Sequence, residues 1–298
     1  MRSFDELQAE FAARQATVIG YSPDTMRIFQ GACVPAANDD QALWTLLNQL
    51  PSPGPIQEAG PLSFFDAYSA LVGALVASNH PLDPVAAAKR NLADWGNAPP
   101  SWENGYKTLA KRLGLAQQMA FSIDYPATPD EGFWGLWRRS APASGLSVQF
   151  AAAALSGRIK FGHLLTFAPL PGDWYTPSVM TVAYQNPSGP PWNPNSPITW
   201  ESTFGANGIL RRVVIGLVCV SDVEVSYEAD AGFTADQQDQ IHSHTAGGLW
   251  PYYLESANAR TSVDFTADGA MQTSITSTKS RPVVIGVQIH SAAGWFGG

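Results

Sequence analysis

Two apolar runs constrain the fold of this chain more than any other feature. They read VVIGLVCVS at 213–221 and VVIGVQIHS at 283–291, and both carry a serine at the same offset from VVIG. A near-continuous apolar run of this length is typical of a strand that is covered on both faces. We therefore expect the two segments to be central strands that lie close together in one sheet.

Strand-like patterns fill the chain from about residue 146 onward, with turn signals between them. We expect strands at 146–155, 157–169, 178–186, 209–229, 259–267, 270–278 and 281–291. The stretch DVEVSYEAD alternates, so Val223, Val225 and Tyr227 should face one way and the acidic side chains the other. We interpret the acidic row as a solvated sheet face, with a cation site as the alternative.

The first 125 residues show helical spacing of apolar side chains instead. We expect helices that begin near Phe4, Asp39, Ser63, Asp83 and Ser101, separated by proline- and glycine-rich joints. The apolar stretch at 67–77 is about half as long as the roughly 20 residues that a membrane span needs. It therefore predicts a buried helix and no transmembrane segment.

Together these patterns predict an α+β fold. A helical N-terminal region, 1–125, would pack on a mostly antiparallel β-sheet or sandwich that is built from a β-rich domain, 146–298. Between them, 126–145 would form an aromatic linker, in which Phe133, Trp134 and Trp137 pack between the two halves.

The charge content of the chain limits the partners that it can have. Charged residues make up 14% of the sequence, against roughly 25% in typical soluble proteins, and the net charge is −8. No lysine or arginine occurs between Lys160 and Arg211, so we expect neither nucleic acid nor an anionic membrane as a partner. Low charge suits chains that assemble, are exported or bind neutral partners, and we expect a homo-oligomer. The N-terminus shows no Sec signal, which makes the cytoplasm the default, or export by a route without an N-terminal signal peptide.

The stretch QDQIHSHTAGGLW places two histidines one residue apart. On a strand, His242 and His244 would face the same way and could bind zinc, with His290 as a third ligand. However, Thr234 and Gln237 form a capping box, and two glycines after His244 can end a helix. On a helix, residues two apart point about 200° away from each other. We therefore expect a helix and no metal, and keep a zinc-dependent hydrolase as the alternative.

Other familiar chemistries are absent from the sequence. It contains no GxSxG elbow, no GxGxxG or GKS/GKT phosphate loop and no CxxC pair. Cys219 lies in an apolar run without a basic neighbour that would activate its thiol. Of the five histidines, His290, near the end of a central strand, is the candidate that we single out for a catalytic base, with a hydrogen-bonded core or rim histidine as the alternative.

The most unusual stretch runs from 170 to 200 and is rich in proline, asparagine and aromatic residues. Its candidate ligand-binding residues are Trp174, Tyr175, Tyr184, Trp192 and Trp200. Rigid aromatic loops of this kind suit neutral ligands or protein surfaces. Alternatively, the aromatic rings fix the loop to the sheet and bind nothing. Trp250, Tyr252 and Tyr253, and also Trp295 and Phe296, could join the same aromatic region.

These observations favour a non-enzymatic binding or self-assembling protein, such as an exported effector or toxin-like component. It would recognise a neutral partner through the aromatic, proline-rich loop. The alternative is an enzyme, either a metal-dependent hydrolase or a small-molecule pocket enzyme, that uses His242, His244 and His290. A viral or phage structural subunit is a further alternative.

Overall fold

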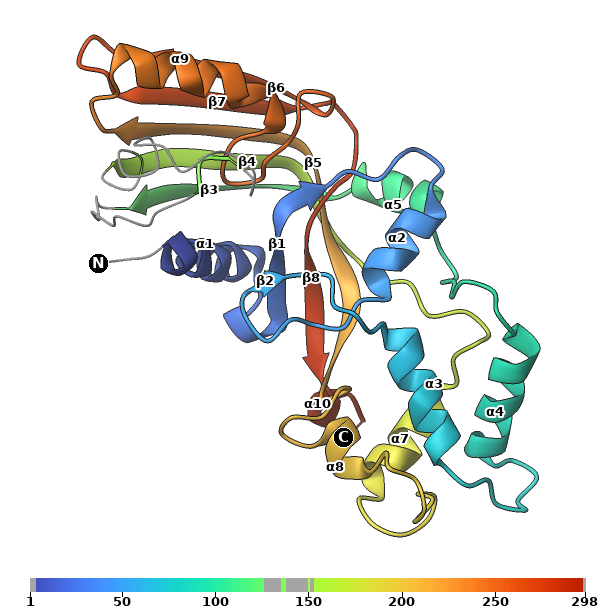
Figure 1. Cartoon of the computed structure of the whole chain (residues 1–298). Helices are drawn as coiled ribbons and strands as arrows, with labels where there is room; N and C mark the ends of the chain where they lie inside the picture. The colour runs from blue at the N-terminus through green and yellow to red at the C-terminus, as the bar shows by residue number, and fades with distance from the viewer. Residues whose placement is uncertain (1–3, 126–134, 138–149, 151–152, 297–298) are drawn as a thin grey trace.

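The computed structural model describes residues 4–125, 135–137, 150 and 153–296. One sheet of eight strands organises these residues (Figure 1). Its strands are β1 (Met26–Cys33), β2 (Ile56–Gln57), β3 (Gln117–Tyr125), β4 (Ala154–Phe167), β5 (Arg212–Asp230), β6 (Ala259–Phe265), β7 (Met271–Ser277) and β8 (Val283–Ser291). The order is β2-β1-β8-β5-β4-β3, and β7 pairs with both β5 and β6. Only the short pairing of β1 with β2 is parallel, so the α+β class with a mostly antiparallel sheet is confirmed.

The helices are interspersed among the strands rather than confined to the N-terminal region. They are α1 (Phe4–Ile19), α2 (Asp40–Leu47), α3 (Phe64–Ala74), α4 (Pro84–Trp95), α5 (Tyr106–Leu113), α7 (Pro177–Gln185), α8 (Trp200–Phe204), α9 (Ala235–His244) and α10 (Ala292–Phe296). In Figure 1, α2 to α5 and α7 lie on one side of β5 and β8. Helix α1 lies on the opposite side, next to β1. None of the helices in the described residues has the length and hydropathy of a membrane span.

Strand β5 joins two parts of the sheet. Its first half pairs with β8, and its second half pairs with β7 after a bend (Figure 1). Asp222 lies at this bend with a positive φ of 51°, and its carboxylate accepts a hydrogen bond of 2.8 Å from the Ser280 amide. Asparagine and aspartate tolerate this left-handed conformation better than most residues. Beyond the bend Val223, Val225 and Tyr227 are buried while Glu224 is exposed, as the alternation predicts.

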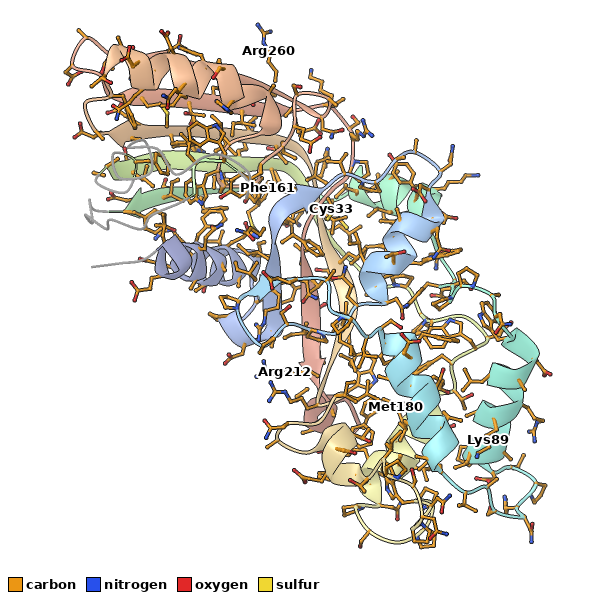
Figure 2. All side chains as sticks on the ribbon, in the orientation of Figure 1. Cys33, Lys89, Phe161, Met180, Arg212 and Arg260 are labelled. Atoms are coloured by element: carbon orange, nitrogen blue, oxygen red, sulfur yellow. The ribbon has the colours of Figure 1, made fainter. Side chains whose placement is uncertain are left out.

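The two VVIG segments are neighbours, as predicted. They form the first half of β5 and the whole of β8, which pair antiparallel with Val213 opposite His290 and Val220 opposite Val283. Both strands have helices or other strands packed on either face, and their apolar side chains divide between two cores. The first core contains Phe161 and the second contains Met180 (Figure 2).

The expectation that the first 125 residues are all helical is wrong, because β1, β2 and β3 lie within them. In β3, Phe121, Ile123 and Tyr125 are buried while Ser122 and Asp124 are exposed. This alternation is the period of a half-buried strand, and it is visible in the sequence. The domain boundaries at 125 and 146 stay a prediction. The single sheet contains strands from before residue 125 and strands from after residue 146.

The expectation of a strand at 178–186 is also wrong, because this segment is α7. Pro177 occupies its first turn, where proline favours a helix, and Val179, Met180 and Ala183 are buried at helical spacing. The expected strand at 146–155 lies largely outside the described residues, as do Phe133 and Trp134 of the linker. The described linker residue Trp137 contacts the His244 ring, with centroids 5.6 Å apart.

The predicted helix starts are confirmed at α2, α3 and α4. The side chains of Asp39, Ser63 and Asp83 each accept a hydrogen bond from a backbone amide of the first turn. Such caps satisfy donors that have no partner inside the helix. The three helices are therefore fixed where the sequence places their signals.

Candidate functional site

The histidine pair lies on α9 and not on a strand. Thr234 caps this helix through a capping box with Gln237, as predicted. His242 packs against the ring of Phe265 at 5.5 Å, whereas His244 packs against Trp137. The two imidazoles therefore contact different partners and do not converge on one ion.

His290 lies on β8, far along the sheet from α9 (Figure 1). Its ring contacts Trp295, with centroids 5.5 Å apart. The structure therefore does not assemble the three-histidine zinc site of the hydrolase alternative, since α9 lies beside β7 whereas the end of β8 that carries His290 leads into α10 (Figure 1). Among the described residues, no group of three or more His, Cys, Asp or Glu side chains could hold a metal. Burial also raises the pKa of the Cys219 thiol, which disfavours a reactive thiolate there.

The aromatic residues of 170–200 turn inward. Trp174 is fully buried, and its indole N–H donates a hydrogen bond of 2.8 Å to the Ser101 carbonyl. Its ring makes edge-to-face contacts with Phe64, Phe65 and Tyr68 at 5.2 to 6.0 Å. Trp174 is therefore a core residue rather than a ligand contact.

Trp192 and Trp200 fix the loop in the same way. Their indole N–H groups donate to the Asn186 and Tyr184 carbonyls, both at 2.7 Å. Tyr184 and Trp200 also contact the ring of Phe204 at 5.3 and 6.2 Å. Three of the five predicted ligand-binding residues thus attach the loop to the second core, and the same packing accounts for their half-buried state.

Of the five, Tyr175 borders an apolar cavity in the part of the chain that the structure describes. This cavity, the apolar cavity, has a volume of about 340 Å³. Its lining residues are Leu47, Phe64, Trp102, Ala168, Pro169, Leu170, Pro171, Tyr175, Pro177, Val213, Val214, Ile215, Trp295 and Phe296. None of these is charged, and they come from α2, α3, β5, α10 and the segments around 102 and 168–177.

The apolar cavity lies where the pairing between β4 and β5 ends. Their pairing ends with Phe167 opposite Leu217, although β5 begins earlier at Arg212. Pro169 and Pro171 follow β4, and proline cannot donate to a sheet. The chain instead pairs with the segment before α5, where the Glu103 amide donates to the Leu170 carbonyl at 3.0 Å. A space opens between this segment and the start of β5.

A bulge in β5 shapes the cavity wall. The register with β8 shifts between Val214 and Gly216, so Ile215 is an extra residue. In a regular strand only alternate side chains share a face, yet Val213, Val214 and Ile215 all border the cavity. The bulge and the strand edge together bring three consecutive residues to one space.

The cavity reaches the surface at two apolar side chains. Leu170 is 63% exposed and Trp295 is 48% exposed, and both belong to the lining. Polar atoms are few: among the lining side chains they are the Tyr175 hydroxyl and the indole N–H groups of Trp102 and Trp295. Burial, and then the nearby Tyr68, raises the pKa of Tyr175, so its hydroxyl stays neutral at physiological pH.

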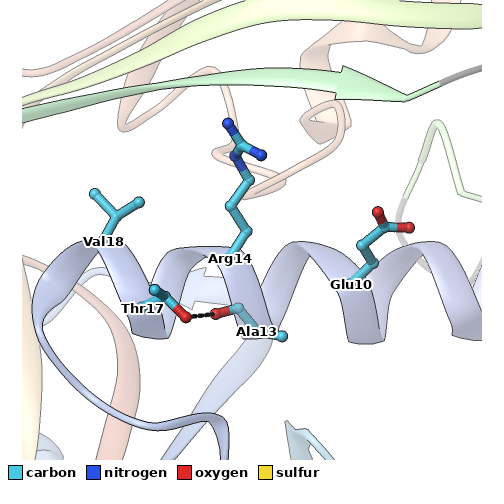
Figure 3. Close-up of a pocket in the computed structure, with 5 residues that line it drawn as sticks. All are labelled: Glu10, Ala13, Arg14, Thr17 and Val18. Carbon is cyan, nitrogen blue, oxygen red and sulfur yellow. Dashed lines mark hydrogen bonds between the residues drawn. The ribbon is translucent and has the colours of Figure 1, made fainter.

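Two further hollows have linings that are less typical of a ligand site. One has a volume of about 400 Å³, and the described residues that line it all come from α1, where Glu10, Arg14 and Val18 rise from the same side (Figure 3). The other lies on the solvated sheet face beside the ion pair of Lys160 and Glu224. Among the described residues, neither hollow gathers a set of apolar side chains from separate elements, as ligand sites usually do.

The sequence indicates Tyr175, Trp295 and Phe296 as members of an aromatic region but does not indicate that they surround a cavity. The signal that could have done so is the APLP stretch at 168–171, where alternate prolines end a strand. The other expected members of the aromatic region lie elsewhere: Trp250 packs in the first core against Phe11 at 5.3 Å.

Comparisons with known proteins add no further constraint. No protein-family model, no curated protein and no solved structure matches the chain. The apolar cavity therefore has to be interpreted from its own geometry.

Proposed function

We propose that this chain is a non-enzymatic binding protein that holds a neutral, mainly apolar partner in the apolar cavity. The observation that carries the proposal is the lining, in which uncharged side chains from separate elements converge on one space of about 340 Å³. Pockets that bind small molecules have this character, with volumes of roughly 300–1,000 Å³ and few polar groups. We retain the predicted neutral partner but propose a different site, the apolar cavity, which only the start of the proline-rich stretch borders through Leu170, Pro171, Tyr175 and Pro177.

The low charge of the chain supports the same function. A charged ligand would lose its hydration in this cavity and gain no opposite charge from the lining residues. The exposed side chains of Leu170 and Trp295 also form an apolar entrance, which is where a ligand would first make contact.

A fluorescence titration with the neutral probe N-phenyl-1-naphthylamine tests the proposal. Val214→Phe should reduce probe binding at least about tenfold, because the larger ring occupies the cavity. Ala120→Phe, on the exposed face of β3, is the matched control and should bind the probe like the unchanged protein. Equal binding by both variants, with unfolding midpoints showing that both fold, would place the probe outside this cavity and refute the proposal.

The other expected roles stay proposals. Self-association as a homo-oligomer, export as an effector or toxin-like component, and a structural role in a virus or phage are each compatible with the low charge. A pocket enzyme that uses His290 would share the same cavity, since His290 contacts the lining residue Trp295.

A further inference from the structure

The wall of the apolar cavity contains an open strand edge. Residues 212–216 of β5 precede the last pair with β4, Phe167 opposite Leu217, and have their strand partner only in β8. Val213, Val214 and Ile215 of this stretch border the cavity. In the part of the chain that the structure describes, no strand covers their other side.

The opposite wall of the cavity is formed in part by residues 168–171, which follow β4. At Gly216 the two segments are still in contact, because a Cβ on this residue would lie 3.2 Å from the Cβ of Ala168. Beyond Ala168 the chain is held by the segment before α5, through the Glu103–Leu170 bond and a bond of 2.9 Å from the Gly172 amide to the Ser101 carbonyl. The cavity therefore lies beyond Gly216, between the edge of β5 and a wall that is anchored to another segment.

The edge of β5 needs hydrogen-bond partners that a purely apolar ligand does not provide. The N–H and C=O groups of successive strand residues point alternately to the two sides. At least one of Val213, Val214 and Ile215 therefore directs its backbone groups away from β8. Backbone groups that are removed from water without a partner destabilise a bound state.

We infer that the cavity takes an extended, uncharged peptide segment with apolar side chains, which adds as a short strand to the edge of β5. The inference rests on the proposed function and names its partner class. Strand addition would satisfy the open edge through main-chain hydrogen bonds, while the apolar lining receives the side chains. The lining carries no charge, so an uncharged segment fits it. Three residues of a strand span roughly 10 Å.

Two matched peptides separate strand addition from simple apolar binding. Acetyl-Val-Ile-Val-N-methylamide should displace N-phenyl-1-naphthylamine from the protein. The same peptide with a methyl group on the central backbone nitrogen keeps its apolar surface but loses a donor. A hydrogen bond contributes about 0.5–1.5 kcal/mol, and 1.4 kcal/mol corresponds to tenfold. We expect the methylated peptide to bind about three- to tenfold more weakly.

A labelled carbonyl gives a second measurement. With ¹³C=O at the central residue, the infrared amide band of the bound peptide should shift to the frequency of a paired strand. Val214→Phe should abolish both the displacement and this shift, whereas Ala120→Phe should preserve both.

The outcomes distinguish the two proposals. Equal displacement by both peptides, or none by either while the probe still binds, overturns strand addition and leaves the apolar ligand site standing. No binding of the probe to the unchanged protein overturns the proposed function itself. Displacement that Val214→Phe leaves intact places the peptide elsewhere and also overturns the inference.

Discussion

Replacing Trp174 with alanine should strongly destabilise the fold. The direct effect is on stability and not on ligand binding, because Trp174 is not among the residues that line the apolar cavity. The side chain is fully buried and contacts several aromatic rings of the second core. An aromatic side chain buries roughly 150–250 Å², which at about 25 cal/mol per Å² corresponds to roughly 4–6 kcal/mol. Measured substitutions of buried tryptophan by alanine cost about 3–5 kcal/mol. The Ser101 carbonyl keeps its bond from Gly172, so no acceptor is left without a partner. We expect a loss of about 4 kcal/mol.

Guanidinium unfolding followed by circular dichroism measures this loss. With a denaturant dependence of roughly 4 kcal/mol per molar, the midpoint should fall by about 1 M. Trp192→Ala, from the segment that follows α7, is the control, and loss of its half-buried ring should cost about half as much. A variant Trp174→Ala that unfolds within about 1 kcal/mol of the unchanged protein, yet no longer binds the naphthylamine probe, would show that Trp174 is a ligand contact.

Four other predictions test the fold. Gly286→Ala should destabilise by about 1–3 kcal/mol, because its Cβ would lie 2.3 Å from a main-chain oxygen of β1. Gly73→Ala, with open space around it in α3, should stabilise by about 0.5–1 kcal/mol; equal unfolding midpoints would refute this pair. Thr234→Ala should cost about 1 kcal/mol through loss of the α9 cap, and serine should restore most of it. Burial raises the pKa of Tyr252 and Tyr253 in the folded protein, so the unfolded chain loses these protons at a lower pH, near 10. The free energy of unfolding should therefore fall as the pH rises above about 10. Ionisation of both tyrosines near pH 10 in the folded protein, measured by ultraviolet absorbance, would contradict this.

The parts of the fold that the sequence predicts well are those with strong local signals. The VVIG strands pair because a segment that is apolar on both faces has few stable positions other than the middle of a sheet. The caps at Asp39, Ser63 and Asp83 fix their helices through side-chain hydrogen bonds that depend only on nearby residues. Such local chemistry is readable without knowledge of the tertiary contacts.

Where the local signals were ambiguous, tertiary packing decided. The segment 178–186 contains β-branched residues and alternates in part, but Pro177 and the spacing of its buried residues make it α7. Strand β3 carries a clear alternation, yet the helical patterns that precede it favour one continuous helical region up to residue 125. In both segments the spacing of the buried side chains predicts the secondary structure better than the secondary structure of the neighbouring segments does.

The candidate site was harder to predict because its residues are ordinary apolar ones. Trp174, Trp192 and Trp200 attracted attention as aromatic residues in a proline-rich loop, but each one's indole N–H is used inside the protein. The cavity instead depends on where β4 stops and on the register of β5 with β8. Neither can be derived from composition, since both are properties of strand pairs.

The same sheet geometry explains why the site lies at this point. A strand edge without a partner is a liability, and proteins commonly bury it or limit its length. Here the prolines after β4 end the pairing early, and the bulge at Ile215 changes the direction of the β5 side chains, so the short open edge faces an apolar cavity that reaches the surface at Leu170 and Trp295. Bulges occur often beside binding sites because they redirect side chains in this way. The two prolines and the bulge are both needed: without the prolines β4 would cover the edge, and without the bulge fewer side chains would line the cavity.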